Sequence, residues 1–326
     1  QKTQRLAKEE KQASKRAKTL QRELDWVRQS PKGRQAKSKA RLSSYERLLN
    51  EDQKEKEEKL EIYIPNGPRL GTNVIEALHI SKAFGDKLLY DDLNFRLPQN
   101  GIVGIIGPNG AGKTTLFNMI TGVYHPSEGH IFLESTQLDG MPVHKIAQAG
   151  VARTFQNIRL FSDLTCYENV KTSCQKNVHY GFLDGILRTS RCRSEEARLD
   201  NECKEYLREV GLWEQANVLA RNLPYGMQRR LEIARAMVTF PKLLLLDEPA
   251  AGMNEEESRQ LTEIIKELRD KHDVTIIIID HHMDVIMDVC DKITVINFGT
   301  QIATGAPESI QSNPDVIAAY LGENES

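Results

Sequence analysis

Residues 102–115 read Ile-Val-Gly-Ile-Ile-Gly-Pro-Asn-Gly-Ala-Gly-Lys-Thr-Thr, and this stretch indicates the fold of most of the chain. A short apolar run comes first, as expected of a buried strand, and a glycine-rich turn follows it. The turn matches G-x-x-x-x-G-K-[ST], a phosphate-binding pattern that requires a strand before it and a helix after it. We therefore expect a strand at residues 102–106 and a helix that begins at Lys113.

The composition of this loop suits the phosphates of a nucleotide. Its glycines let backbone N–H groups close around phosphate oxygens, and the helix N-terminus adds a favourable dipole. Lys113 is expected to reach the β- and γ-phosphates, and the hydroxyl of Thr114 is expected to ligate Mg²⁺. The predicted nucleotide contacts in the loop are Gly107, Asn109, Gly110, Gly112, Lys113, Thr114 and Thr115.

A second apolar run, residues 243–246, ends in Asp247 and Glu248. On its own such a run is often no more than the end of a strand. Beside a phosphate loop it predicts the acidic partner of that loop, in which Asp247 holds Mg²⁺ through water. Glu248 is then expected to position and polarise the attacking water.

The remaining sequence from residue 74 alternates strand-like and helix-like patterns. Continuous apolar runs are typical of buried parallel strands, whereas the first two stretches favour an antiparallel edge and the last two a closing hairpin. Residues 158–221 are mostly polar and helical, so we expect them to form an inserted lobe. The predicted strands are residues 74–80, 94–97, 102–106, 243–246, 274–279, 293–297 and 301–304.

The charge of the chain is unevenly distributed. The total is −2, but residues 1–61 hold 18 Lys/Arg against 11 Asp/Glu. These residues are good helix formers, and they predict two antiparallel helices at residues 4–29 and 35–60, followed by a linker at residues 62–73. A basic arm on an acidic body indicates a polyanionic partner, although a solvated surface is the commoner role of a charge run.

The composition also indicates the cellular compartment of the protein. The five cysteines show no metal-binding spacing and read as free thiols in a reducing environment. The apolar runs are far shorter than the roughly 20 residues that span a bilayer. We expect a cytoplasmic protein whose membrane role, if it has one, needs a separate membrane partner. Because the chain begins with Gln1 rather than Met, we also expect sequence upstream.

The stretch Leu223-Pro224-Tyr225-Gly226-Met227-Gln228 lies where ATP-binding cassette (ABC) ATPases carry the signature Leu-Ser-Gly-Gly-Gln. The chain resembles that family here, and Ala251-Gly252-Met253-Asn254 resembles its D-loop. The resemblance implies that two such domains pack head to tail, with ATP between the phosphate loop of one and the signature of the other. It implies nucleotide contacts from Tyr225, Gly226 and Met227.

Three further residues match elements of the family. Phe84 resembles the aromatic residue that stacks on adenine, and Gln156 resembles the Q-loop glutamine, a catalytic residue and Mg²⁺ ligand. His281 resembles the switch histidine that contacts the γ-phosphate. His282 directly follows it, and the His-x-Met pattern favours His281.

The sequence departs from the family pattern in two places. Pro224 replaces the signature serine and offers neither a hydroxyl nor an N–H group, although proline suits the first turn of a helix. Asp280 stands where many relatives carry glutamate before the switch histidine. The first departure puts in doubt the contact between the signature and the γ-phosphate.

Two branches of the family are represented. Residues 1 to about 120 resemble translational throttle proteins of the ABC-F family, for example in WVRQSPKGRQAKSKARL (residues 26–42) and KLEIYIPNGPRLG (residues 59–71). From about residue 120 the chain resembles the ATP-binding subunits of branched-chain amino-acid importers, as in GVARTFQNIRLFSDL (residues 150–164) and LDEPAAGMN (residues 246–254).

Each branch implies a function. An importer subunit hydrolyses ATP beside membrane permease subunits, on the cytoplasmic face of the inner membrane. An ABC-F factor binds the ribosome through ribosomal RNA and tRNA. The sequence leaves both open and favours the importer.

The expected fold is α/β: a P-loop NTPase of the ABC type with a mixed sheet core, an antiparallel β edge and a helical subdomain, preceded by an α-helical hairpin. The expected domains are the hairpin arm at residues 1–61, the linker at 62–73 and the ATP-binding domain at 74–326. The cofactors implied are ATP and Mg²⁺.

The basic arm yields a prediction that separates the two branches. Arg28, Lys32, Arg34, Lys37, Lys39 and Arg41 lie in one stretch without an acidic residue. Contact with RNA phosphates would release counterions, so binding should weaken steeply with salt and show little sequence preference. Residues 1–62 should bind RNA or ribosomes at low salt. Binding should be lost when Arg34, Lys37, Lys39 and Arg41 are changed to Glu, and no binding at low salt would contradict an RNA-docking arm.

Overall fold

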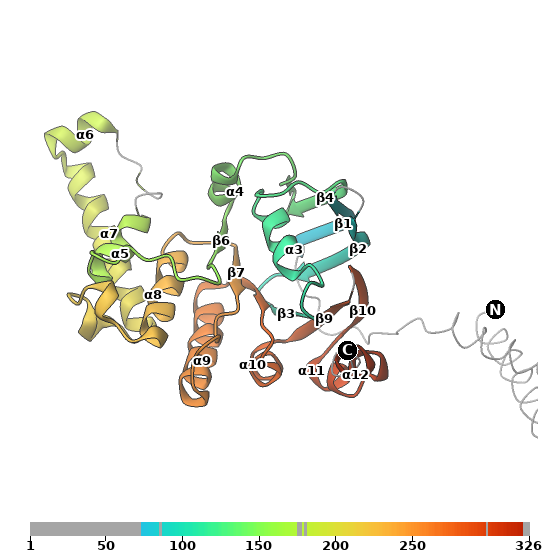
Figure 1. Ribbon diagram of the computed structural model, residues 1–326. Coiled ribbons are helices and arrows are strands. Elements are labelled where there is room, and N and C mark those ends of the chain that lie inside the picture. The colour runs from blue at the N-terminus through green and yellow to red at the C-terminus, as the bar shows by residue number, and fades with distance from the viewer. Residues whose placement is uncertain (1–72, 85–86, 175–177, 179–180, 298, 322–326) are drawn as a thin grey trace, which may run out of the picture. The chain divides into compact units, whose positions relative to one another are not determined.

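The computed structural model describes residues 73–84, 87–174, 178, 181–297 and 299–321. The predicted helical hairpin and residues 62–72 of the predicted linker lie outside these residues. Asn73, which we expected to end the linker, instead begins the first strand. The described part of the chain forms one α/β unit with two sheets and a helical lobe (Figure 1).

The first sheet is antiparallel, with the strand order β2-β1-β4-β5. It confirms the predicted antiparallel edge, but its strands are longer and more numerous than expected because β4 and β5 carry no continuous apolar run. The strands are β1 (Asn73–Phe84), β2 (Lys87–Pro98), β4 (Glu128–Leu133) and β5 (Thr136–Gln137).

The second sheet is mixed, with the order β10-β9-β3-β8-β7-β6. Its first five strands in that order match the predicted core strands and closing hairpin, and β6 was not predicted. The strands are β3 (Ile102–Ile106), β6 (Val151–Arg153), β7 (Leu243–Asp247), β8 (Thr275–Ile279), β9 (Lys292–Asn297) and β10 (Thr300–Gly305). Five strands run parallel, and β10 pairs with β9 antiparallel.

Every residue of β3, β7 and β8 is buried, which explains their unbroken apolar sequences. Alternate side chains of a strand face opposite layers. Leu244 and Leu246 pack in the cluster that holds α9 and α10, whereas Leu243 and Leu245 pack with α3 and the antiparallel sheet. Burying each such side chain stabilises the fold by about 1.5–3 kcal/mol.

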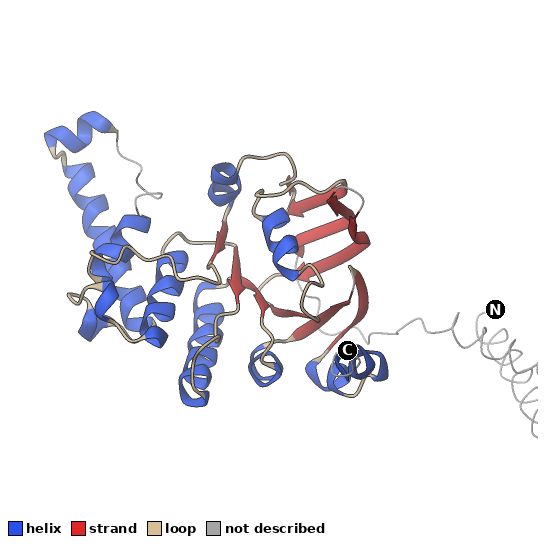
Figure 2. Cartoon of the chain, viewed as in Figure 1, coloured by secondary structure: helices blue, strands red, loops and turns tan. Residues whose placement is uncertain are grey.

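The helices of this core cover both faces of the mixed sheet (Figure 2). The predicted helix after the glycine-rich turn begins at Lys113, as expected. The core helices are α3 (Lys113–Ile120), α4 (Val143–Ala149), α9 (Glu255–His272), α10 (Met283–Val289), α11 (Pro307–Gln311) and α12 (Pro314–Leu321). Helix α9 starts with a capping box, in which Asn254 and Glu257 bond each other's backbone N–H groups.

A helical lobe lies on the side away from the antiparallel sheet (Figure 1). It contains the described helices of the predicted lobe at residues 158–221, and α8 adds to it by packing on α5 and α7. Its elements are α5 (Cys166–Cys174), α6 (Phe182–Leu187), α7 (Ser190–Glu209), η2 (Trp213–Gln215), η3 (Ala220–Asn222) and α8 (Tyr225–Met237). Buried residues such as Leu207 and Leu231 join one continuous cluster with one face of the mixed sheet.

The five cysteines are buried and unbridged, as the sequence predicts. Among the described residues, no helix combines the length and apolar character that crossing a membrane requires.

Candidate nucleotide-hydrolysis site

The turn between β3 and α3 has a backbone that only glycine fits at two positions. A side chain on Gly107 (φ +157°) would place its Cβ 1.9 Å from the carbonyl oxygen of Ile296. At Gly112 (φ +97°) the Cβ would lie 2.6 Å from the hydroxyl of Tyr90. The glycine spacing of the motif therefore follows from close packing beneath the loop, which Tyr90 supports from β2.

Lys113 opens α3 with its side chain buried in the loop. Its Nζ donates to the carbonyl oxygens of Gly107, at 2.5 Å, and Pro108, at 3.0 Å. The ammonium is thereby held at the centre of the turn. The other predicted contacts lie on the outside of the loop or are half-buried: Asn109, Gly110, Thr114 and Thr115.

The end of β7 presents the buried side chain of Asp247. Arg153, at the end of the neighbouring β6, donates from Nη2 to Asp247 Oδ2 at 2.6 Å and from Nη1 to Asn118 Oδ1 at 2.6 Å. A buried carboxylate requires such a partner. No sequence motif marks Arg153, because its partner Asp247 lies 94 positions further along the chain.

Glu248 follows Asp247 and has a left-handed backbone, with φ +49°. This conformation is unfavourable for a residue with a side chain. Its N–H donates to the carbonyl oxygen of Ile279 in β8 at 2.7 Å. The turn directs the carboxylate away from the sheet towards two other predicted catalytic residues.

The three predicted catalytic residues converge. Gln156 donates from Nε2 to Glu248 Oε2 at 2.9 Å, and His281 Nδ1 lies 3.8 Å from Glu248 Oε1. They come from the loops after β6, β7 and β8, which lie next to one another in the sheet. Ligands of such sheets bind at the carboxyl ends of the strands. The structure brings these three side chains together, and their catalytic roles stay predictions.

The two adjacent histidines differ in their surroundings. His281 faces Glu248, whereas Nδ1 of His282 lies 2.8 Å from Asp280 Oδ1. The imidazole rings are 4.1 Å apart. His281 Nδ1 also lies 3.9 Å from Asp280 Oδ1, and the role of His281 as the switch residue stays a prediction.

Phe84 ends β1 and is 46% exposed. Its ring packs edge-on against Tyr124 with the centroids 5.4 Å apart, and Lys82 Nζ lies 4.9 Å from its centre. An exposed aromatic surface is suitable for stacking on a base. The sequence analysis missed Tyr124, for which no local motif exists.

Tyr225, Gly226 and Met227 form the first turn of α8, and Pro224 is the N-cap residue. Pro224 therefore lies one residue earlier than the first helical turn, where we expected it, and it supplies no side-chain cap. Figure 1 places α8 in the lobe, well apart from α3. The head-to-tail pairing that would bring these residues to the phosphate loop of a second chain stays a prediction.

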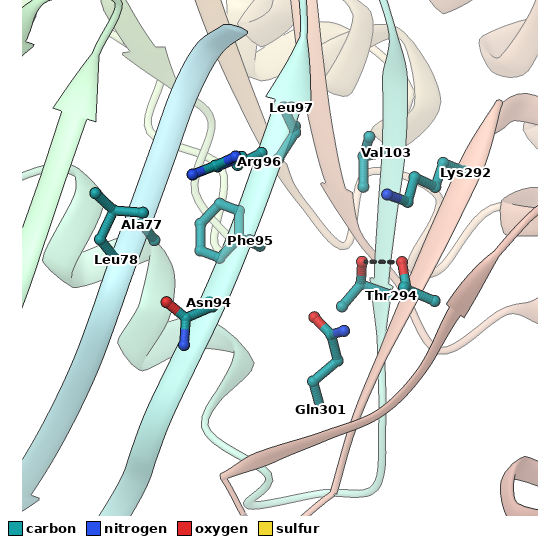
Figure 3. A pocket seen from close by; sticks show the side chains of 11 residues that line it. Ala77, Leu78, Asn94, Phe95, Arg96, Leu97, Val103, Lys292, Thr294 and Gln301 are labelled. Carbon is teal, nitrogen blue, oxygen red and sulfur yellow. Dashed lines mark hydrogen bonds between the residues drawn. The ribbon is translucent and has the colours of Figure 1, made fainter. Parts of the chain in front are cut away.

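A cavity of about 300 Å³ lies elsewhere, between the two sheets and near the amino ends of β3 and β9 (Figure 3). Phe95, Val103, Lys292 and Gln301 are among its lining residues. None of the predicted site residues lines it, so it is separate from the site at the carboxyl ends.

Comparison with known proteins identifies the family. A family model described as "ABC transporter" matches residues 90–251, and one described as "Branched-chain amino acid ATP-binding cassette transporter" matches residues 300–326. The chain is 48% identical over 240 residues to the high-affinity branched-chain amino acid transport ATP-binding protein LivG of Escherichia coli K12, covering 74% of this chain and 94% of LivG. The chain belongs to the ATP-binding cassette family. It is accordingly an ATPase.

Two further comparisons extend this result. The cassette is 46% identical over 250 residues to BraF of Pseudomonas aeruginosa, another high-affinity branched-chain amino acid transport ATP-binding protein, covering 77% of this chain and 98% of BraF. It is 37% identical over 268 residues to the energy-dependent translational throttle protein EttA of Escherichia coli K12. That match covers 82% of this chain but 43% of EttA. Both predicted resemblances are confirmed.

Solved structures of ATP-binding cassettes share the fold. The crystal structure of the ADP conformation of MJ1267, described as an ATP-binding cassette of an ABC transporter, superposes with a TM-score of 0.67 at 27% identity, covering 77% of this chain and all of that one. The predicted ABC-type α/β fold of the ATP-binding domain is confirmed, and the predicted helical hairpin lies outside the described residues.

The proline of the signature yields a prediction. A serine hydroxyl at Pro224 would add one hydrogen bond to a charged phosphate, worth roughly 1.5–3 kcal/mol. Pro224→Ser should therefore tighten ATP-driven dimerisation or raise turnover, measured by sedimentation and by phosphate release. If both quantities stay unchanged or fall, the helix N-terminus already compensates for the missing hydroxyl.

Proposed function

We propose that this cassette is the ATP-hydrolysing subunit of an importer for branched-chain amino acids. The observation that carries the proposal is the convergence of Gln156, Glu248 and His281 beside the phosphate loop. The transport role rests on LivG and BraF, whose names assign that activity to them and which this chain matches over nearly their whole length.

The loop fits the phosphates of ATP. Its backbone passes so close to Ile296 and Tyr90 that side chains are excluded, which leaves N–H groups to face an anion. Lys113 adds a fixed positive charge. In the proposal Phe84 stacks on adenine and Asn109, Gly110 and Thr115 contact the phosphates.

The oxygen donors suit Mg²⁺, which prefers hard oxygen ligands. Thr114 and Gln156 would ligate it directly, and Asp247 would do so through water. When bound, the ion neutralises charge that develops on the phosphates. Arg153 orients the carboxylate of Asp247 at the end of β7.

Hydrolysis requires a water molecule in line with the γ-phosphate and a group that accepts its proton. Glu248 would orient that water and take the proton. Gln156 would hold one carboxylate oxygen through its amide N–H, and His281 would contact the γ-phosphate. The carboxylate is thus held between two neighbours and needs little reorganisation.

The signature residues would act on a second cassette. Tyr225 is exposed, Met227 is half-buried and Gly226 is buried, and all three lie in the first turn of α8, where the helix dipole favours an anion. Because α8 lies apart from α3 in one chain, a head-to-tail dimer would complete two sites at once. We propose this dimer as the active form.

A cavity of about 310 Å³ between the core and the lobe would receive the permease subunits. Val123, Val143 and Ile146 give it an apolar side, and Glu232 and Arg235 of α8 give it a charged one. Burial raises the pKa of Glu232. A helix with an apolar face and a polar edge fits such a surface.

This cavity is linked to the catalytic loop. Arg229 of α8 is buried, and its guanidinium donates to the carbonyl oxygens of Phe155, at 2.8 Å, and Gln156, at 2.5 Å. Phe155 lines the cavity, and Gln156 bonds Glu248. A displacement of the lobe by the permease would therefore move Gln156 relative to Glu248, and the reverse follows by linkage.

A second candidate role concerns the arm. The match to EttA and the net basic charge of residues 1–61 favour contact with RNA phosphates. Ribosomal RNA and tRNA would be the partners in that case. The absence of acidic residues between Arg28 and Arg41 makes this stretch the expected contact.

The catalytic role is tested by Glu248→Gln. ATP affinity should stay within about twofold because the phosphate loop is untouched. Turnover should fall at least roughly 100-fold because the amide cannot accept the proton. Glu256→Gln is the matched control, since the exposed Glu256 accepts hydrogen bonds from Arg259 and Gln260 of its own helix α9. Undiminished turnover in Glu248→Gln would exclude this carboxylate from catalysis.

The permease surface is tested by Val143→Asp. Val143 is exposed at the cavity, and a charge there should weaken association with an apolar partner helix. Permease-stimulated hydrolysis should fall severalfold while basal hydrolysis of the isolated cassette stays unchanged. Ile317→Asp, in α12, is the control, because Ile317 is 44% exposed and Val143 is 51% exposed. An equal loss in both variants would contradict a specific surface at Val143.

A further inference from the structure

Asp280 follows β8 and is buried, with its side chain inaccessible to solvent. Its Oδ1 accepts hydrogen bonds from the backbone N–H of His281 at 2.8 Å and of His282 at 2.9 Å. The Nδ1 of His282 lies 2.8 Å from the same oxygen. One carboxylate oxygen therefore fixes the turn from which His281 projects.

The other oxygen of Asp280 serves a different loop. Oδ2 accepts the backbone N–H of Ala250 at 3.4 Å. Ala250 lies two residues after Glu248, on the loop that carries the predicted catalytic carboxylate. Asp280 thus joins the turn of His281 to the loop of Glu248.

The preceding residue braces the same loop. The carbonyl oxygen of Ile279 accepts the N–H of Glu248, which is held in a left-handed conformation. Such a conformation persists only where its surroundings enforce it. Two consecutive residues, Ile279 and Asp280, supply contacts to both ends of the turn of residues 248–250.

The donor atoms of Asp280, His281 and His282 lie within 4.8 Å of one another, a separation that a metal ion could also bridge. However, Oδ1 of Asp280 is already surrounded by three nitrogen groups, and Nδ1 of His282 is directed at it. A carboxylate with this many donors is occupied as an acceptor. The cluster is therefore better described as a hydrogen-bonded clamp.

We propose that Asp280 is a positioning residue for ATP hydrolysis. It sets the separation and orientation of Glu248 and His281 without contacting the nucleotide. The proposal rests on the proposed roles of those two residues. It goes beyond them because it assigns their alignment to one buried carboxylate.

Asp280→Asn tests the proposal with little change of shape. The amide keeps one acceptor oxygen, and its NH₂ group cannot accept an N–H bond, so one of the two loops loses its anchor. A displacement of about 1 Å in a catalytic group can cost roughly 100-fold. We expect kcat to fall about 10- to 100-fold, with KM for ATP and the affinity for ATP within about twofold of wild type.

A matched control separates positioning from general stability. Asp139 is a comparable clamp in the antiparallel sheet, where it accepts the N–H of Ile131 at 2.9 Å and pairs with His130 at 3.0 Å. Asp139→Asn should leave kcat unchanged. An equal fall of kcat in both variants, in parallel with their unfolding temperatures, would overturn the proposal.

Two more variants keep the test decisive. His282→Ala removes one ring contact from Asp280 and leaves the backbone contacts, so kcat should fall by a smaller factor of about 2–5, with KM unchanged. His282→Ala decides the outcome if Asp280→Asn does not fold. An unchanged kcat in His282→Ala would then overturn the proposal. When two residues act as a unit, the effects of substituting them are not additive. The double variant Glu248→Gln/Asp280→Asn should therefore hydrolyse ATP no more slowly than Glu248→Gln alone.

The outcomes distinguish this proposal from the function on which it rests. Full activity in Glu248→Gln would remove the proposed catalytic role of that carboxylate. Loss in Glu248→Gln together with wild-type kcat in Asp280→Asn would leave the catalytic role in place and overturn only the positioning role of Asp280.

Discussion

Parallel pairing of β6, β7, β8 and β3 brings their carboxyl ends to one edge of the mixed sheet, and the loops that follow them are neighbours for that reason. The strands hold this register because both faces of β3, β7 and β8 are buried, so a shift by one residue would exchange the two layers packed against them. The phosphate loop, Gln156, Glu248 and His281 all depend on this register.

The same edge concentrates buried charge. Asp247, Asp280 and Lys113 have little access to water, and each is held by partners within the site. Arg153 compensates Asp247, backbone N–H groups surround Asp280, and carbonyl oxygens of the loop receive Lys113. Buried charges are tolerated only when they are satisfied in this way. The polar groups are therefore both a cost to stability and the means by which catalytic atoms are fixed.

The lobe is joined to this edge by both apolar and polar contacts. Residues of α5, α7 and α8 share a buried cluster with one face of the mixed sheet. The guanidinium of Arg229 donates to the backbone carbonyl oxygens of Phe155 and Gln156. Under the proposed function, a partner bound between lobe and core would act on a segment that already touches Glu248. This geometry would couple the partner to hydrolysis without any contact between the partner and the nucleotide.

The sequence by itself determined the elements with local signatures. Gly107 and Gly112 occupy positions whose backbone leaves no room for a side chain, so the glycine motif predicts the loop. The apolar runs predict strands that are buried on both faces, and Asp247-Glu248 marks the end of one of them. The short strands β4, β5 and β6 and helix α4 escaped prediction because half-exposed elements of a few residues lack a clear period.

Tertiary structure alone decided which distant residues meet. Arg153 and Asp247 are 94 positions apart, and Ala250 and Asp280 are 30 apart, so no periodicity links them. The structure also showed that His282 hydrogen-bonds Asp280 at 2.8 Å, whereas only His281 of the two comes within 4 Å of Glu248, a difference that two identical adjacent residues do not reveal in the sequence. Sheet order, rather than spacing along the chain, made these contacts.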